Sequence, residues 1–208
     1  MGSAAFADLL LELRLVGMAP LGALAERMEI PEAALSDSVE QAVEQGWVRA
    51  FSGRVSGVAL TDQGRLVGEV LLREELVVEE ALTAIESVYS QFLPINQEIL
   101  RICTDWQVYR GSLNLHEDLE YDRAVHTRLS EAIDRVMPLL STLASAQARF
   151  GRYAPQLRQA EARFLAGDEP WLLRPLLPSV HTVWFELHEH LLAVLGRSRS
   201  EERVTPAQ

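Results

Sequence analysis

The sequence predicts a mainly α-helical protein whose N-terminal third also contains a small β-ribbon. Apolar residues recur at helical spacing along most of the 208 residues, and one short segment is rich in β-branched and aromatic residues. A hydrophobic content of 48% is enough to build a sizeable core. We expect three parts: a domain of helices and β-ribbon at residues 1–75, an all-helical domain at residues 76–196, and a disordered tail at residues 197–208.

The N-terminal domain is predicted to fold as three helices, a ribbon and a fourth helix. Apolar spacing, broken at Pro31, predicts the three helices over residues 3–17, 19–30 and 32–45. The segment "WVRAFSGRVSGVAL", residues 47–60, favours a two-stranded ribbon because β-formers flank Ser-Gly pairs. Thr61 is expected to cap the next helix, since its hydroxyl can accept a hydrogen bond from a first-turn amide.

This order of elements resembles the winged helix-turn-helix of MarR-type transcriptional regulators. The resemblance covers residues 5–75 and includes the step Gly46-Trp47-Val48 and the segment "LTDQGR", residues 60–65, directly after the ribbon. It implies that the helix at residues 32–45 enters the major groove of double-stranded operator DNA, while the ribbon tip touches the minor groove or phosphates. It also implies a homodimer and a role as a ligand-responsive transcriptional regulator.

Helical projection indicates which residues of the third helix face outward. Leu35, Val39, Ala42 and Val43 are expected to be buried, which leaves the opposite side for DNA. Gln41 can read adenine and Asp37 can accept from cytosine, whereas phosphate contacts require nearby arginines. Together with the resemblance, the projection assigns eight residues to DNA: Ala33, Ala34, Asp37, Ser38, Gln41, Arg27, Arg49 and Arg54.

The charge of the chain supports an alternative. The net charge is −11, the 19 basic residues are all arginine, and the third helix contains no basic residue. Because phosphate neutralisation supplies much of the affinity for DNA, this charge has the wrong sign for nonspecific binding. The alternative is a winged-helix protein that has lost DNA binding and acts through protein contacts or a bound small molecule.

The remaining chain is predicted to be almost entirely helical. One or two helices follow residue 66, another begins with Pro94 in its first turn, and residues 111–118 form a polar loop. The last helix is expected to end at Gly196, with Glu189 on its exposed side. Such a domain is suited to dimerisation and to sensing a small molecule.

Two of these helices carry polar residues beside an apolar stripe. Small-molecule sites are commonly built from such lines of polar groups within apolar walls. The residues expected to line a pocket for a small-molecule effector are Asn96, Trp106, Gln107, His181, Trp184 and His188. The alternative is that these side chains hydrogen-bond one another inside an ordinary helical core.

Other classes of site find little support in the sequence. Asp122 and His126 are similar to the Asp-x-x-x-His step of metal-binding domains in FadR-like GntR regulators, but the spacing of the later histidines does not match well. We therefore expect no metal and no cofactor. Neither a phosphate-binding loop nor a nucleophile elbow occurs, so we expect no enzyme activity. The single Cys103 excludes an internal disulfide, and the absence of a signal segment and of a long apolar run predicts a cytoplasmic protein without membrane association.

Overall fold

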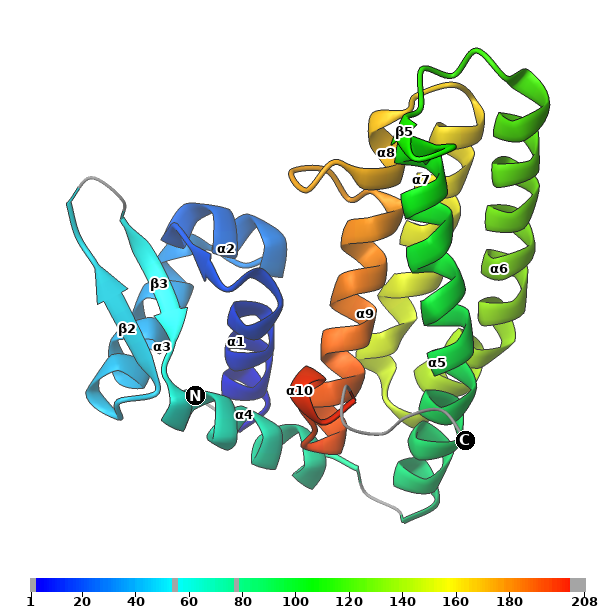
Figure 1. Cartoon of the computed structure of the whole chain (residues 1–208). Coiled ribbons are helices and arrows are strands. Elements are labelled where there is room, and N and C mark those ends of the chain that lie inside the picture. Colours follow the sequence, from blue (N-terminus) through cyan, green and yellow to red (C-terminus); the bar gives the residue numbers. More distant parts are fainter. Residues whose placement is uncertain (1–2, 54–55, 77–78, 203–208) are drawn as a thin grey trace. The chain divides into compact units, whose positions relative to one another are not determined.

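The chain is mainly helical, as predicted, and divides into two compact units (Figure 1). The computed structural model describes residues 3–53, 56–76 and 79–202. Unit 1 comprises residues 1–77 and 189–208, and unit 2 comprises residues 78–188. The C-terminal end of the chain therefore groups with the N-terminal unit, whereas the sequence placed residues up to 196 in the helical domain.

Within its described residues, unit 1 contains helices and a three-stranded sheet. The helices of its N-terminal part are α1 (Ser3–Val16), α2 (Leu21–Met28), α3 (Glu32–Glu44) and α4 (Asp62–Glu74). The strands are β1 (Met18–Ala19), β2 (Val48–Phe51) and β3 (Gly57–Leu60). The unit also includes the second half of α9 (Val180–Leu195) and the short helix α10 (Arg199–Glu202), which lies inside the segment predicted to be a disordered tail. Residues 203–208 of that tail lie outside the described residues.

The predicted ribbon is present as an antiparallel pair, β2 and β3, with Arg49 opposite Ala59. A third strand, β1, pairs with the other edge of β3, so that the sheet order is β1-β3-β2. The sequence did not reveal β1, because a strand of two residues is too short to show alternation.

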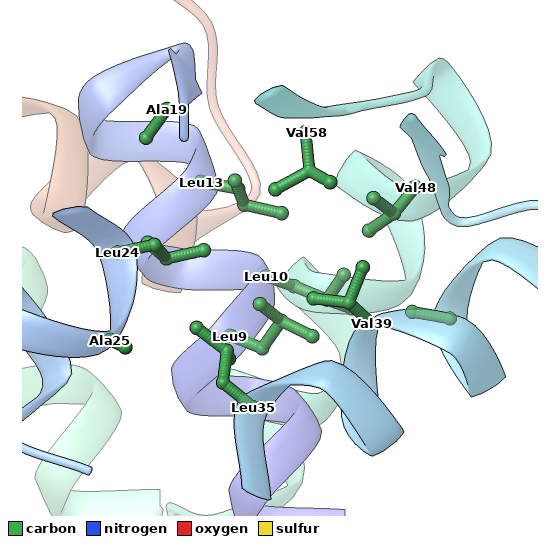
Figure 2. Close-up of a cluster of buried hydrophobic side chains, with 11 residues drawn as sticks. Leu9, Leu10, Leu13, Ala19, Leu24, Ala25, Leu35, Val39, Val48 and Val58 are labelled. Atoms are coloured by element: carbon green, nitrogen blue, oxygen red, sulfur yellow. The ribbon is translucent and has the colours of Figure 1, made fainter. Parts of the chain in front are cut away.

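The core of unit 1 lies between α1, α3 and the sheet (Figure 2). Leu9, Leu10 and Leu13 of α1 meet Leu35 and Val39 of α3, and all five side chains are buried. Val48 and Val58 close the cluster from the sheet (Figure 2). This packing fixes one side of α3 and leaves the other side to the solvent.

Thr61 and Gly64 join the sheet to α4. The Thr61 hydroxyl accepts from the Gly64 amide at 3.0 Å, which confirms the predicted cap, and it also donates to the Gly46 carbonyl at 2.7 Å. A Cβ on Gly64 would lie 1.9 Å from the carbonyl oxygen of Trp47. Only glycine therefore allows α4 to pack so closely against the residue that precedes β2.

Unit 2 is built around two long helices, α5 (Glu79–Gln107) and α6 (Leu119–Ala146), which pack along each other (Figure 1). The 3₁₀ helix η1 (Ala148–Arg152), α7 (Tyr153–Leu165), α8 (Pro170–Leu173) and the first half of α9 complete the bundle. A small hairpin of β4 (Val108–Tyr109) and β5 (Ser112–Leu113) begins the connection from α5 to α6, where the sequence predicted a polar loop.

The predicted helix start at Pro94 is wrong, because α5 continues through this residue. Proline removes one backbone hydrogen bond from a helix interior, and that loss favoured a boundary. The apolar side of α5 is buried on both sides of the proline, through Phe92, Ile95 and Ile99. This continuous packing stabilises one helix in spite of the missing hydrogen bond.

Candidate functional site

Four of the five residues of α3 that the sequence assigned to DNA lie on its exposed side. Ala33, Ala34, Asp37 and Gln41 are exposed. Helix α2 ends at Met28, and the next residue, Glu29, turns the chain sharply toward α3 with a φ of 55°. Pro31 then precedes the first turn of α3. The pair α2 and α3, joined by this short turn, forms a compact element with one side of α3 free for contact.

The assignment of Ser38 to this exposed side is wrong. Ser38 is 1% exposed and its hydroxyl donates to the Ala34 carbonyl at 3.0 Å, whereas Val43, which was expected in the core, is 39% exposed. The buried arc of α3 is centred on Leu35 and Ala42, and Ser38 lies at one margin of it while Val43 lies at the other. A serine is small enough to be enclosed once its hydroxyl has a backbone partner.

The arginines near α3 differ in their availability to phosphates. Arg27 donates from Nε to the buried carboxylate of Glu12 at 2.5 Å, so its charge is already compensated. Arg49 is exposed on β2, and no ion pair of its guanidinium occurs among the described residues. Arg54 lies outside the described residues.

A second set of arginines binds acidic groups inside unit 1. Arg14, which is buried, contacts Glu69 of α4 at 2.6 Å and Glu189 of α9 at 2.8 Å. Arg65 and Arg199 approach the same Glu189 carboxylate at 3.3 and 3.2 Å. Burial raises the pKa of Glu189, but the hydrogen bonds and charges of Arg14 and Arg199 outweigh it and hold the pKa below its usual range. The predicted exposure of Glu189 is therefore wrong, because three arginines enclose it.

The six residues predicted to line one pocket in unit 2 do not form one cluster. The Trp184 indole donates to the Asn96 side chain at 2.9 Å, and its ring stacks on Phe92 with centroids 4.9 Å apart. His188 packs against Phe92 from the next turn of α9. These aromatic rings pack between α5 and α9, and the indole hydrogen bond gives the Asn96 side chain a partner within the bundle.

Trp106 and Gln107 lie apart from this cluster. Trp106 packs near the C-terminal end of α5 against Phe164 and two histidines, and the Gln107 side chain is exposed. His181 is half-buried in the first turn of α9. Ten residues of helix separate Asn96 from Trp106, a rise of about 15 Å. Helical spacing showed which residues share a side of α5, but not that two different neighbours cover that side.

The Trp106 cluster includes a polar network that the sequence did not predict. His116 lies with its ring centroid 4.2 Å from that of Trp106, and its Nδ1 is 3.1 Å from Asp122 of α6. Asn114 donates to the same carboxylate at 3.1 Å and to the Trp106 carbonyl at 3.2 Å. The available signal was the density of polar residues in "NLHEDLEYD", residues 114–122, which predicted only a loop and a helix start.

His126 of α6 completes the cluster on the other side of Trp106, with ring centroids 5.3 Å apart. Its Nε2 is buried, and within the described residues it has no hydrogen-bond partner. Burial lowers the pKa of His126, although Asp122 partly opposes this effect.

The described residues contain no group of three or more histidine, cysteine or carboxylate side chains that could hold a metal ion. Burial also raises the pKa of the Cys103 thiol to about 12, which keeps it protonated in neutral solution.

Searches of protein-family models, curated proteins and solved structures found no match to this chain. Among the described residues, no helix has both the length and the apolar character needed to cross a membrane. The assignment of function therefore depends on the chemistry and arrangement of the residues themselves.

Proposed function

We propose that unit 1 is a winged helix-turn-helix domain and that the protein is a DNA-binding transcriptional regulator acting as a homodimer. The observation that carries this proposal is the arrangement of α2, α3 and the β2–β3 hairpin around α1, with α3 exposed on one side. In a helix-turn-helix protein the second helix of the pair reads the major groove. Helix α3 would take that role, and the hairpin would be the wing.

The exposed residues of α3 suit close approach to bases better than attraction to phosphates. Ala33 and Ala34 are small and permit near contact, and the Gln41 amide can pair with adenine. Arg49 of β2 is the described arginine beside α3 that is both exposed and without an ion pair within the described residues. Arg49 would supply the phosphate contact that orients the domain.

The test is a fluorescence anisotropy titration of the full chain against DNA from its own promoter region, at two salt concentrations. Saturable binding that weakens steeply with salt is expected. Arg49→Ala should weaken binding and lower the slope of log K against log salt by about 1–2 in a dimer. The matched control is Arg123→Ala, an exposed arginine of α6 in unit 2, which should leave both quantities unchanged. An absence of saturable binding at low salt would overturn the proposal.

A second candidate function is contact with another protein through the same side of α3. It is favoured by charge, because Glu32, Asp37, Glu40 and Glu44 are exposed while Arg27 is paired with Glu12. Such a surface would attract a basic partner rather than a polyanion. This function would be established by two results together. The DNA titration would show no binding, and Asp37→Asn would lose a protein partner that the control variant Glu131→Gln retains.

A further inference from the structure

The connection from α5 to α6 lies at one end of unit 2 (Figure 1). It lines an open pocket of about 680 Å³. This volume lies within the range of about 300–1,000 Å³ that is usual for sites of small organic ligands. The residues around it come from the β4–β5 hairpin, the segment that follows and the first turn of α6. All of them belong to unit 2, so the pocket does not depend on the rest of the molecule.

The segment that forms the pocket is held in a fixed conformation. Arg110 and Gly111 both have positive φ, which gives the tight hairpin turn, and His116 has a φ of 58°. Positive φ in a residue other than glycine is costly and persists only where the surroundings determine it. The Asp122 carboxylate and the Trp106 ring, which contact the His116 side chain, provide these surroundings.

The pocket has an apolar rim. Leu113, Leu115 and Leu119 all contribute to its lining and are 74%, 69% and 63% exposed. Three large aliphatic side chains around one concave site are unusual on a surface that has no partner. An apolar group small enough to enter between these leucines would bury their side chains from water, which favours binding.

The charge within the pocket is negative. Glu117 and Asp118 line it together with one cation, Arg110, whose guanidinium lies over the Tyr109 ring at 4.8 Å. One oxygen of Asp118 accepts from the Tyr109 hydroxyl at 2.7 Å and the other from the Tyr121 amide at 3.1 Å, and the Glu120 amide also contributes a hydrogen bond. A carboxylate oxygen can accept more than one hydrogen bond, so both retain capacity for a donor. The hydrogen bond from Tyr109, followed by those from the backbone, lowers the pKa of Asp118, which is ionised in neutral solution.

We propose that this pocket binds a small organic ammonium ion with an apolar body. The leucine rim would enclose the body, and Asp118 with Glu117 would face the charged nitrogen. The role of this pocket as the effector site of a regulator rests on the proposed function. Binding of the ammonium ion itself requires unit 2 alone.

The experiment is isothermal titration calorimetry of the full chain, without DNA, with three probes that share a phenyl ring. Phenethylammonium is expected to bind, phenethyl alcohol to bind about 10-fold more weakly, and phenylacetate to show no binding, because the pocket is negative. Equal binding of the alcohol, or tighter binding of phenylacetate, would overturn the charge assignment. No binding of any probe at millimolar concentration would overturn the site itself.

Three variants locate the binding. Asp118→Asn should weaken phenethylammonium about 10-fold, and the fold should persist because asparagine also caps helices well. Glu120→Gln is the matched control, an exposed carboxylate two residues away that does not line the pocket, and it should change affinity less than about twofold. Arg110→Asn should strengthen binding, since it removes the competing cation and asparagine tolerates a positive φ.

The leucine rim is tested by Leu115→Ser, which should weaken phenethylammonium without changing the sedimentation coefficient. A change from dimer to monomer in this variant would instead identify the rim as a subunit contact and overturn the proposal. The outcome is separable from that of the DNA titration. If the protein binds phenethylammonium but not DNA, only the proposed regulatory function is overturned. If it binds DNA but not phenethylammonium, only the proposed ligand site is overturned.

Discussion

Gly64 illustrates how a single residue determines the approach of α4 to the sheet. An added Cβ would meet the Trp47 carbonyl oxygen at 1.9 Å, and backbone cannot move aside as a side chain tip can. We expect Gly64→Ala to destabilise unit 1 by about 2–4 kcal/mol, measured by urea unfolding. Gln63→Ala, at the exposed neighbouring position, is the control and should be nearly neutral. A neutral Gly64→Ala would show that α4 lies farther from Trp47.

His126 should make the stability of unit 2 depend on pH. Burial lowers its pKa below 6.5, so the folded unit keeps the ring neutral while the unfolded chain takes up a proton below that pH. The folded state therefore loses stability as the pH falls from about 7 toward the lowered pKa. His126→Phe retains the ring contacts with Trp106 and Phe164 and removes the titrating group.

The measurement is chemical unfolding of wild type and His126→Phe between about pH 7.5 and about pH 5. These limits lie above and below the unperturbed histidine pKa of about 6.5. The variant should be about as stable as wild type at the upper limit, and relatively more stable as the pH falls. Thr127→Ala, the exposed neighbour on α6, should follow the wild-type curve. Parallel curves for wild type and His126→Phe would mean that His126 does not contribute to the pH dependence.

At the scale of the element, helix α3 combines a well-packed inner side with an acidic outer side. If α3 enters the major groove, its carboxylates oppose binding, because they repel phosphates and are desolvated in the complex. The double variant Asp37→Asn and Glu40→Gln should therefore bind promoter DNA more tightly than wild type, by about 10-fold at low salt and less at high salt. Glu131→Gln on α6, an exposed carboxylate of unit 2, is the matched control. An unchanged affinity would place α3 away from the DNA.

At the scale of the whole molecule, an ion-pair network joins the two ends of the chain within unit 1. Arg14 of α1 binds both Glu69 of α4 and Glu189 of α9, and 175 residues separate Arg14 from Glu189. Removing one partner from a largely buried pair leaves the other charge incompletely compensated. Glu189→Gln should destabilise unit 1 by about 1–3 kcal/mol at neutral pH, in urea unfolding.

The same variant has a predicted pH dependence. The pKa of Glu189 is held below its usual 4.5, so the ionised carboxylate contributes stability above that pH and loses it as the pH falls through the lowered value. The difference between wild type and Glu189→Gln should shrink under acid conditions. Glu74→Gln, on the exposed side of α4, should show neither effect. A difference that is constant with pH would attribute the loss to packing rather than to charge.

Local patterns of residues were enough to predict the individual helices and the ribbon, because their signals come from neighbouring residues. The apolar spacing of α1, the Thr61 cap and the glycine that ends α9 at Gly196 all depend on contacts within a few residues, and these predictions are confirmed. The mainly α-helical class follows from the same kind of signal. The role of the domains in binding DNA and a small molecule stays a prediction.

The tertiary structure alone decided which residues meet across long separations. Whether Ser38 is enclosed, whether α5 continues through Pro94, and where Glu189 finds its arginines depend on packing between segments that no local pattern records. The same reason brings Trp106 to His116. Periodicity defines the side of a helix, but only the arrangement of its neighbours determines what covers that side along its length.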